Sequence, residues 1–181
     1  MTLFWRDFSK DDIIRVFMPH QPVIDGFEFA SAGATQEGSL PFGGFARLRD
    51  LLASDAGEVS YRLQGLRDER GRPSLRIAVR GTVAMRCQRC LEAIPVEVRE
   101  EELLVLAATQ AEIDADPVDV DTPDRLLAGK AMDVRQLVED QLLLALPYAP
   151  RHERCRAAAG SDAGDKVRPF AGLKGLIRGG H

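Results

Sequence analysis

Residues 75–98 read LRIAVRGTVAMRCQRCLEAIPVEV, and this stretch decides the fold. Apolar and polar side chains alternate from Leu75 to Met85 and again from Ile94 to Val98, on either side of a Cys-Gln-Arg-Cys motif. An alternation of every second residue is typical of a strand that buries one face. The two runs therefore predict two strands, and they place Cys87 and Cys90 in a tight connection between them.

An earlier run adds one more strand to this sheet. Val59, Tyr61 and Leu63 alternate with polar residues, and Gly71 follows in the polar segment before Leu75. Glycine suits the backbone conformations that a hairpin turn requires. This run predicts a half-buried antiparallel hairpin ahead of the cysteine motif.

A helix is predicted after the strands. Asp133 is a typical N-cap residue, Gln136 follows as its capping-box partner, and Pro147 ends the helix. Helical spacing gives the segment an apolar stripe, made of Val134, Leu137, Val138, Leu142, Ala145 and Leu146. The predicted fold class is a single α+β domain, with an antiparallel sheet and a packed C-terminal helix.

The other segments before the helix are assigned from composition and spacing. We expect a short strand in residues 23–30, a loop in the Gly-, Ser- and Pro-rich residues 31–44, and an exposed, mobile loop in the acidic residues 110–124. Residues 45–52 predict a helix that places four apolar side chains on one face: Phe45, Leu48, Leu51 and Leu52.

Two regions divide the chain. Residues 1–155 form the predicted domain, and residues 156–181 form a flexible, basic tail that is loosely ordered because it has too few large apolar residues to bury. A short apolar box interrupts this tail, and its side chains have a spacing that suits docking onto a partner: Phe170, Leu173, Leu176 and Ile177.

Composition excludes several classes of protein. The 181 residues have a net charge of −4 and contain no apolar run long enough to span a bilayer. The N-terminus has acidic residues among its apolar ones and no small-residue cleavage site, so it does not resemble a secretory signal. The three cysteines are an odd number, which fits a reducing compartment, and we therefore expect a cytoplasmic protein. Neither a phosphate-binding loop, nor a dinucleotide fingerprint, nor a nucleophile elbow is present. We therefore expect neither catalysis nor a small-molecule substrate.

The cysteines admit three interpretations. Cys87 and Cys90 could bind one tetrahedral Zn²⁺ if His152 and Cys155 supplied two more ligands. They could instead be a thioredoxin-like redox pair, which requires a helix that begins at the first cysteine. They could also be structural thiols, with Cys87 continuing the apolar face of its strand. Against the metal site, Leu91 occupies the position where zinc knuckles usually have glycine.

Arginines gather on the polar face of the hairpin. Arg76, Arg80 and Arg86 share one strand face, and Arg62 lies on the neighbouring strand, so these four side chains could contact RNA phosphates. The alternative is that they pair with carboxylates such as Glu97 and Glu101. The net negative charge and the lack of interleaved aromatic side chains both argue against a dedicated RNA-binding domain.

Three segments together resemble the bacterial YceD family of large ribosomal RNA subunit accumulation proteins. They are Gly81 to Cys90, which ends in Cys-Gln-Arg-Cys; Val138 to Pro147, which is followed by Pro150 and His152; and the Pro-Phe-Ala-Gly-Leu box of residues 169–173. Residues 23–25 and 27–30 are similar to the N-terminal part of the family. Family members often have more residues between the histidine and the following cysteine than the two that separate His152 from Cys155.

The resemblance implies a function in making the ribosome. It implies a cytoplasmic accessory factor in the synthesis, processing or stability of large-subunit (23S) ribosomal RNA, with no known catalytic residues. The implied partner is this RNA or its precursor ribonucleoprotein, bound directly or through a protein. A direct RNA-binding protein that uses the arginine face, or a zinc-stabilised interaction module, remains an alternative.

Overall fold

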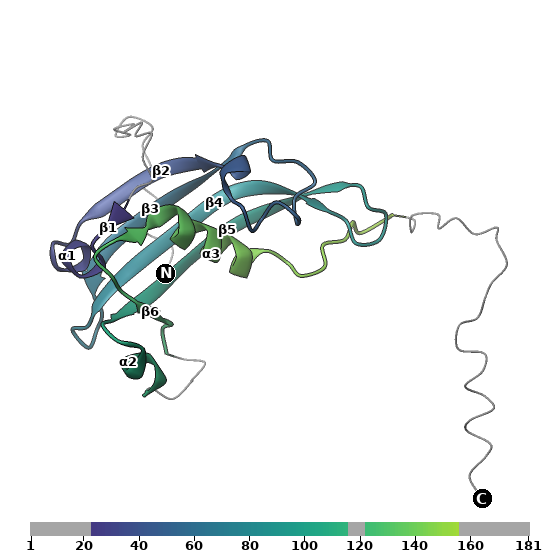
Figure 1. Cartoon of the computed structure of the whole chain (residues 1–181). Coiled ribbons are helices and arrows are strands. Elements are labelled where there is room, and N and C mark those ends of the chain that lie inside the picture. The colour runs from purple at the N-terminus through teal and green to yellow at the C-terminus, as the bar shows by residue number, and fades with distance from the viewer. Residues whose placement is uncertain (1–22, 116–121, 156–181) are drawn as a thin grey trace, which may run out of the picture.

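The computed structural model describes residues 23–115 and 122–155 of the chain (Figure 1). Its main sheet has the strand order β2-β3-β4-β5-β6. The strands are β2 (Thr35–Pro41), β3 (Glu58–Arg67), β4 (Pro73–Arg86), β5 (Ala93–Ala107) and β6 (Arg125–Leu127). Neighbouring strands are antiparallel except β5 and β6, which are parallel. A small second sheet pairs β1 (Val23–Ile24) with β7 (Met132–Asp133).

The predicted central strands are confirmed, and the structure gives their register. Ile77 of β4 lies opposite Leu63 of β3, and Val83 of β4 lies opposite Val96 of β5. Gly71 adopts a positive φ of 77° in the β3–β4 turn, where most other residues would be strained. The alternation of apolar residues therefore gives the sheet one buried face, on the side of these side chains.

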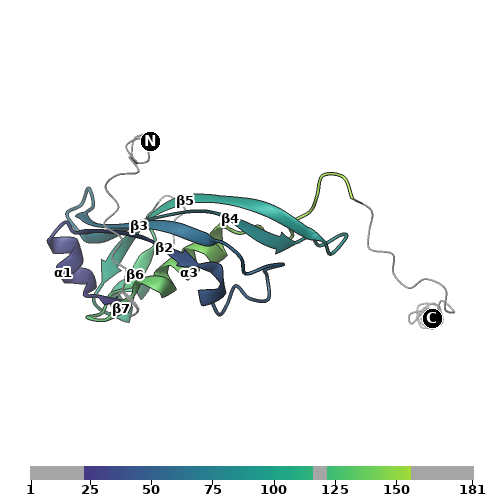
Figure 2. The ribbon, with the colours of Figure 1, turned by 90° about the horizontal axis from the view of Figure 1, so that it is seen from above.

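The predicted helix is α3 (Val134–Ala145), and it covers the buried face of the sheet (Figure 2). The Asp133 side chain caps it by accepting a hydrogen bond from the Arg135 amide at 2.8 Å. On the opposite face of the sheet Arg80 and Arg86 are exposed, whereas Ser74 and Ala78 are buried. The α+β class, with a helix packed on a largely antiparallel sheet, is confirmed.

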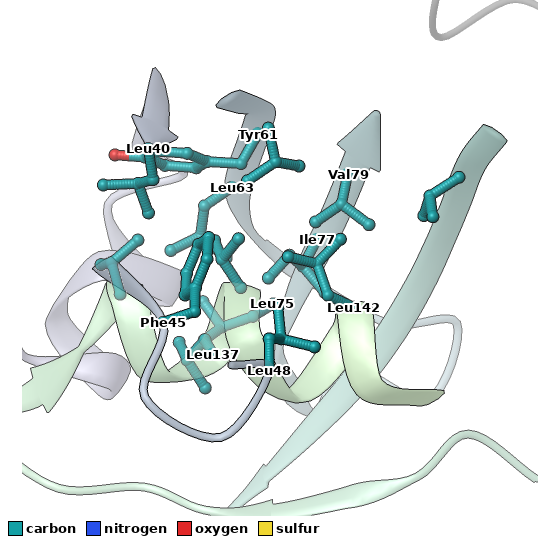
Figure 3. Close-up of a cluster of buried hydrophobic side chains, with 14 of the residues drawn as sticks. Leu40, Phe45, Leu48, Tyr61, Leu63, Leu75, Ile77, Val79, Leu137 and Leu142 are labelled. Atoms are coloured by element: carbon teal, nitrogen blue, oxygen red, sulfur yellow. The ribbon is translucent and has the colours of Figure 1, made fainter. Parts of the chain in front are cut away.

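Residues 45–52 form turns in place of the predicted helix, yet they supply part of the core (Figure 3). Phe45 and Leu48 point between the sheet and α3 and are fully buried, while Leu51 is 41% exposed. Arg47 fixes the segment to α3: its amide donates to Glu139 Oε1 at 2.7 Å and its Nε to Oε2 at 3.1 Å. Tertiary contacts with the helix therefore determine the path of this segment.

The N-terminal predictions are wrong in two places. The expected strand in residues 23–30 is limited to β1, since Asp25 then caps the short helix α1 (Gly26–Ser31) by accepting bonds from two amides. The expected loop in residues 31–44 contains β2 and a single 3-10 turn (Phe42–Gly44). As an edge strand, β2 buries little of its length, and so its polar composition resembles that of a loop.

The acidic segment 110–124 is not a continuous loop. It begins with the short helix α2 (Gln110–Asp114), which Thr109 caps, and its described residues have little burial. The tail and its apolar box, residues 156–181, lie outside the described residues. Within the described ranges, no helix combines the length and the apolar composition that crossing a bilayer requires.

Candidate metal centre

The cysteine motif forms the connection between the two longest strands. Cys87 follows the last residue of β4, its amide donates to the Glu92 carbonyl at 2.8 Å, and its carbonyl accepts from the Leu91 amide at 2.9 Å. Cys90 therefore lies in a tight turn between strands, as predicted. The redox interpretation required a helix beginning at the first cysteine, and the turn replaces it.

The second pair of predicted ligands reaches the turn from α3. The chain beyond this helix runs along the sheet to its far end (Figure 1). The Gln88 amide donates to the Pro150 carbonyl at 2.9 Å, and Arg89 Nη1 donates to the Cys155 carbonyl at 3.3 Å. These bonds hold His152 and Cys155 against the turn. We call residues 86–92 together with 150–155 the cysteine tip.

Four ligand atoms converge in the cysteine tip. The sulfurs of Cys87, Cys90 and Cys155 and a ring nitrogen of His152 all lie within 4.8 Å of one another. The Cys87 and Cys155 sulfurs are 3.8 Å apart, and Cys90 Sγ is 3.4 Å from His152 Nδ1. A tetrahedral zinc with ordinary bond lengths spaces two sulfurs by about 3.8 Å and a sulfur and a nitrogen by about 3.6 Å. The donor set and these two distances fit a closed Cys₃His zinc site.

Backbone amides favour the ionised form of the first thiol. Hydrogen bonding from the Cys90 backbone lowers the pKa of Cys87 to about 5, against the effect of burial, and the His152 and Arg89 backbones act in the same direction. The Arg89 amide lies 3.5 Å from Cys87 Sγ. Burial raises the pKa of Cys155, and the neighbouring Cys87 and Cys90 side chains raise it further. Amides directed at one sulfur suit a thiolate ligand of a cation.

Leu91 adopts a backbone conformation that is usual for glycine. Its φ is +64°, the only positive value of a non-glycine residue in the described ranges. Leu91 occupies the position where zinc knuckles usually have glycine. The backbone makes the turn nonetheless, at a steric cost that is typically about 1–2 kcal/mol for a residue with a Cβ atom.

The predicted arginine face is only partly available to a ligand. Arg62 forms an ion pair with Glu37, and Arg76 Nε lies 3.6 Å from Glu101 Oε1. Arg80 and Arg86 are exposed on the same face. Arg99, which was not among the predicted candidates, lies directly opposite Arg80 on β5. The alternation around Val96 and Val98 could have placed Arg99 on this face.

Comparison with known proteins gives one family. The model of a family described as "Large ribosomal RNA subunit accumulation protein YceD" matches residues 75–177. The match begins in β4, includes the cysteine tip and α3, and extends through the apolar box of the tail. No curated protein and no solved structure matches the chain.

Proposed function

The chain belongs to the YceD family, whose model matches more than half of its residues, and from this membership we propose that it acts in ribosome biogenesis. In this proposal it is a non-catalytic accessory factor in the synthesis, processing or stability of large-subunit ribosomal RNA. The single observation that supports this function is the family match.

A role without catalysis agrees with the chemistry of the cysteine tip. Within residues 23–115 and 122–155, this is the one cluster of three or more His, Cys, Asp or Glu side chains that could hold a metal. Four protein ligands would leave no open coordination position for a substrate, which is typical of structural zinc. We therefore assign the tip to stability and binding.

The same proposal includes a bound Zn²⁺. Cys87, Cys90, His152 and Cys155 would hold the ion, and the metal would join the β4–β5 turn to the segment after α3. All three cysteines are free thiols, and a reducing cytoplasm keeps thiols available to a metal. The partner is large-subunit ribosomal RNA or its precursor ribonucleoprotein, with no small-molecule substrate and no membrane.

Ribosomal RNA levels test the proposed function. In cells that lack the gene, we expect a lower ratio of large- to small-subunit ribosomal RNA, restored by a plasmid copy of the wild-type gene. The ratio is measured on total RNA during fast growth and after cold shock. An unchanged ratio under both conditions would contradict the proposal.

A further inference from the structure

The cysteine tip concentrates exposed positive charge. Four arginines lie within the two short segments that form it, and all four are exposed: Arg86, Arg89, Arg151 and Arg154. Two carboxylates, Glu92 and Glu153, lie in the same segments. Although the whole chain has a net charge of −4, this end of the molecule has an excess of cationic side chains.

The charges of these arginines are not neutralised by the described residues around them. Arg86, Arg151 and Arg154 form no ion pair within residues 23–115 and 122–155, and Arg89 donates one bond to a backbone carbonyl. On the sheet face, by contrast, Arg62 pairs with Glu37. A guanidinium that already holds a carboxylate gains less from a phosphate, because the first partner must be displaced.

The tip also holds its arginines in fixed relative positions. The Gln88 amide bond to Pro150 joins the two segments, and Arg89 Nη1 bonds to the last residue of the second segment. Side chains on a backbone that is already ordered lose less entropy on binding than side chains on a mobile chain. The backbones that carry Arg86 and Arg154, from distant parts of the sequence, are thus joined at one end of the molecule.

We propose that the cysteine tip is an RNA-binding surface, on which Arg86, Arg89, Arg151 and Arg154 contact the phosphodiester backbone. This proposal rests on the proposed function in ribosomal RNA accumulation and identifies the surface that meets the RNA. Guanidinium groups bind phosphate oxygens through two parallel hydrogen bonds, which suits a polyanion better than isolated lysines would.

Two features near the cysteine tip favour RNA as its partner and determine where on the protein the RNA can lie. Tyr148, which is fully exposed three residues before Arg151, offers a ring on which an unpaired base can stack. Along β5 the exposed carboxylates of Glu97, Glu100 and Glu102 repel a polyanion from the sheet edge. An acidic protein can therefore bind RNA at one end, with the acidic part of β5 held away from the phosphates.

RNA binding by the full-length protein tests the proposal. The probe is a short fluorescein-labelled single-stranded RNA, titrated by fluorescence anisotropy over a series of KCl concentrations. The tip variant is R86Q/R89Q/R151Q/R154Q. The matched control is R49Q/R70Q/R80Q/R99Q, which removes the same number of exposed charges elsewhere and includes the arginine pair of the sheet face.

The two variants should behave differently. At about 0.1 M salt the tip variant should bind about 10- to 100-fold more weakly, and its plot of log affinity against log salt should be less steep by about 2–3. The control should lose less than roughly 3-fold, because its arginines are outside the contact. Failure of the wild-type protein to bind the RNA, or equal losses in the two variants, would overturn the proposal.

Additional measurements separate RNA binding at the tip from a folding defect and from a general affinity for acidic polymers. Because Arg89 bonds to the Cys155 carbonyl, the variant R86Q/R151Q/R154Q repeats the test with this contact intact, and thermal melting checks the fold of each variant. Labelled polyglutamate should bind much more weakly than RNA, and equal binding would show a general acidic-partner site instead. An unchanged ribosomal RNA ratio in the deletion strain, together with tip-dependent RNA binding, would contradict the cellular function alone.

Discussion

Single residues in the turn after β4 convert an ordinary strand connection into a ligand cluster. Cys87 lies at the end of an apolar strand face and is completely buried, as a structural thiol would be. The Arg89 amide lies at hydrogen-bonding distance from its sulfur, and Leu91 turns the chain through a positive φ. The amide contact favours the thiolate form of Cys87, which is the form that binds a metal cation.

Leu91→Gly tests the turn geometry at this scale. Glycine adopts a positive φ without a steric cost, so the substitution should stabilise the protein by about 0.5–1 kcal/mol, after allowance for its more flexible unfolded chain. Leu91→Ala is the control, since it removes the same exposed side chain but retains the Cβ atom. Urea denaturation of both variants measures the difference. Equal stability of the two variants would show that the φ of Leu91 stores no strain.

Some site residues could be predicted from the sequence, and others could not. All four proposed ligands were identified from their spacing in two pairs, and the structure brings them together. Sequence could not show that the pairs meet, because the path from α3 to the turn depends on contacts such as Gln88 with Pro150. The same limit applies to Arg62: its face was predicted, but its partner Glu37 lies in a segment that was expected to be a loop.

The helices and strands with a strong apolar periodicity were predicted from the sequence. Those whose structure depends on packing against neighbouring elements were not. The period-two strands β3, β4 and β5 and the capped helix α3 are present where the pattern placed them. In contrast, β2 has an edge strand's polar composition, and α1 has only six residues in a segment that was expected to be a strand. For such elements, tertiary packing outweighs local propensity.

Gly65→Ala tests the packing of α1 on β3. A Cβ atom at Gly65 would overlap the Phe29 carbonyl oxygen and lie 2.7 Å from Ala30 Cα, so α1 would have to move away. We expect a loss of roughly 2–3 kcal/mol, which is typical of overpacking against backbone atoms. Gly129→Ala is the control, because the nearest atom to its added Cβ is 4.0 Å away. Thermal and urea unfolding compare the variants, and equal stability would contradict the close approach.

At the scale of the whole molecule, the hydrophobic core lies along one face of the long sheet, and the ligand cluster lies at one end of it. The helix α3 and residues 45–52 bury one face of the sheet, and the cysteine tip lies at the end opposite α1 (Figures 1 and 2). The family match continues beyond the tip to residue 177, through the apolar box. The division into a domain of residues 1–155 and a tail remains a prediction.

Truncation after Gly160 tests that division. We expect the shortened protein to melt within a few degrees of the full chain, because residues 157–165 contain too few large apolar side chains to bury, and yet to fail in restoring the ribosomal RNA ratio. The control is a full-length chain in which Phe170, Leu173, Leu176 and Ile177 are replaced by serine. A large fall in the melting temperature after truncation would show that the apolar box belongs to the core.

Metal analysis of the purified wild-type protein tests the closed cysteine tip most directly. Inductively coupled plasma mass spectrometry, on protein purified without added metal or chelator, should find about one zinc per chain. Chelation should then lower the melting temperature, since the binding energy of a structural zinc is also folding energy, and Cys90→Ser combined with Cys155→Ser should cost less than the sum of the single changes. A metal-free protein whose melting temperature is unaffected by chelator would contradict the site and leave three structural thiols.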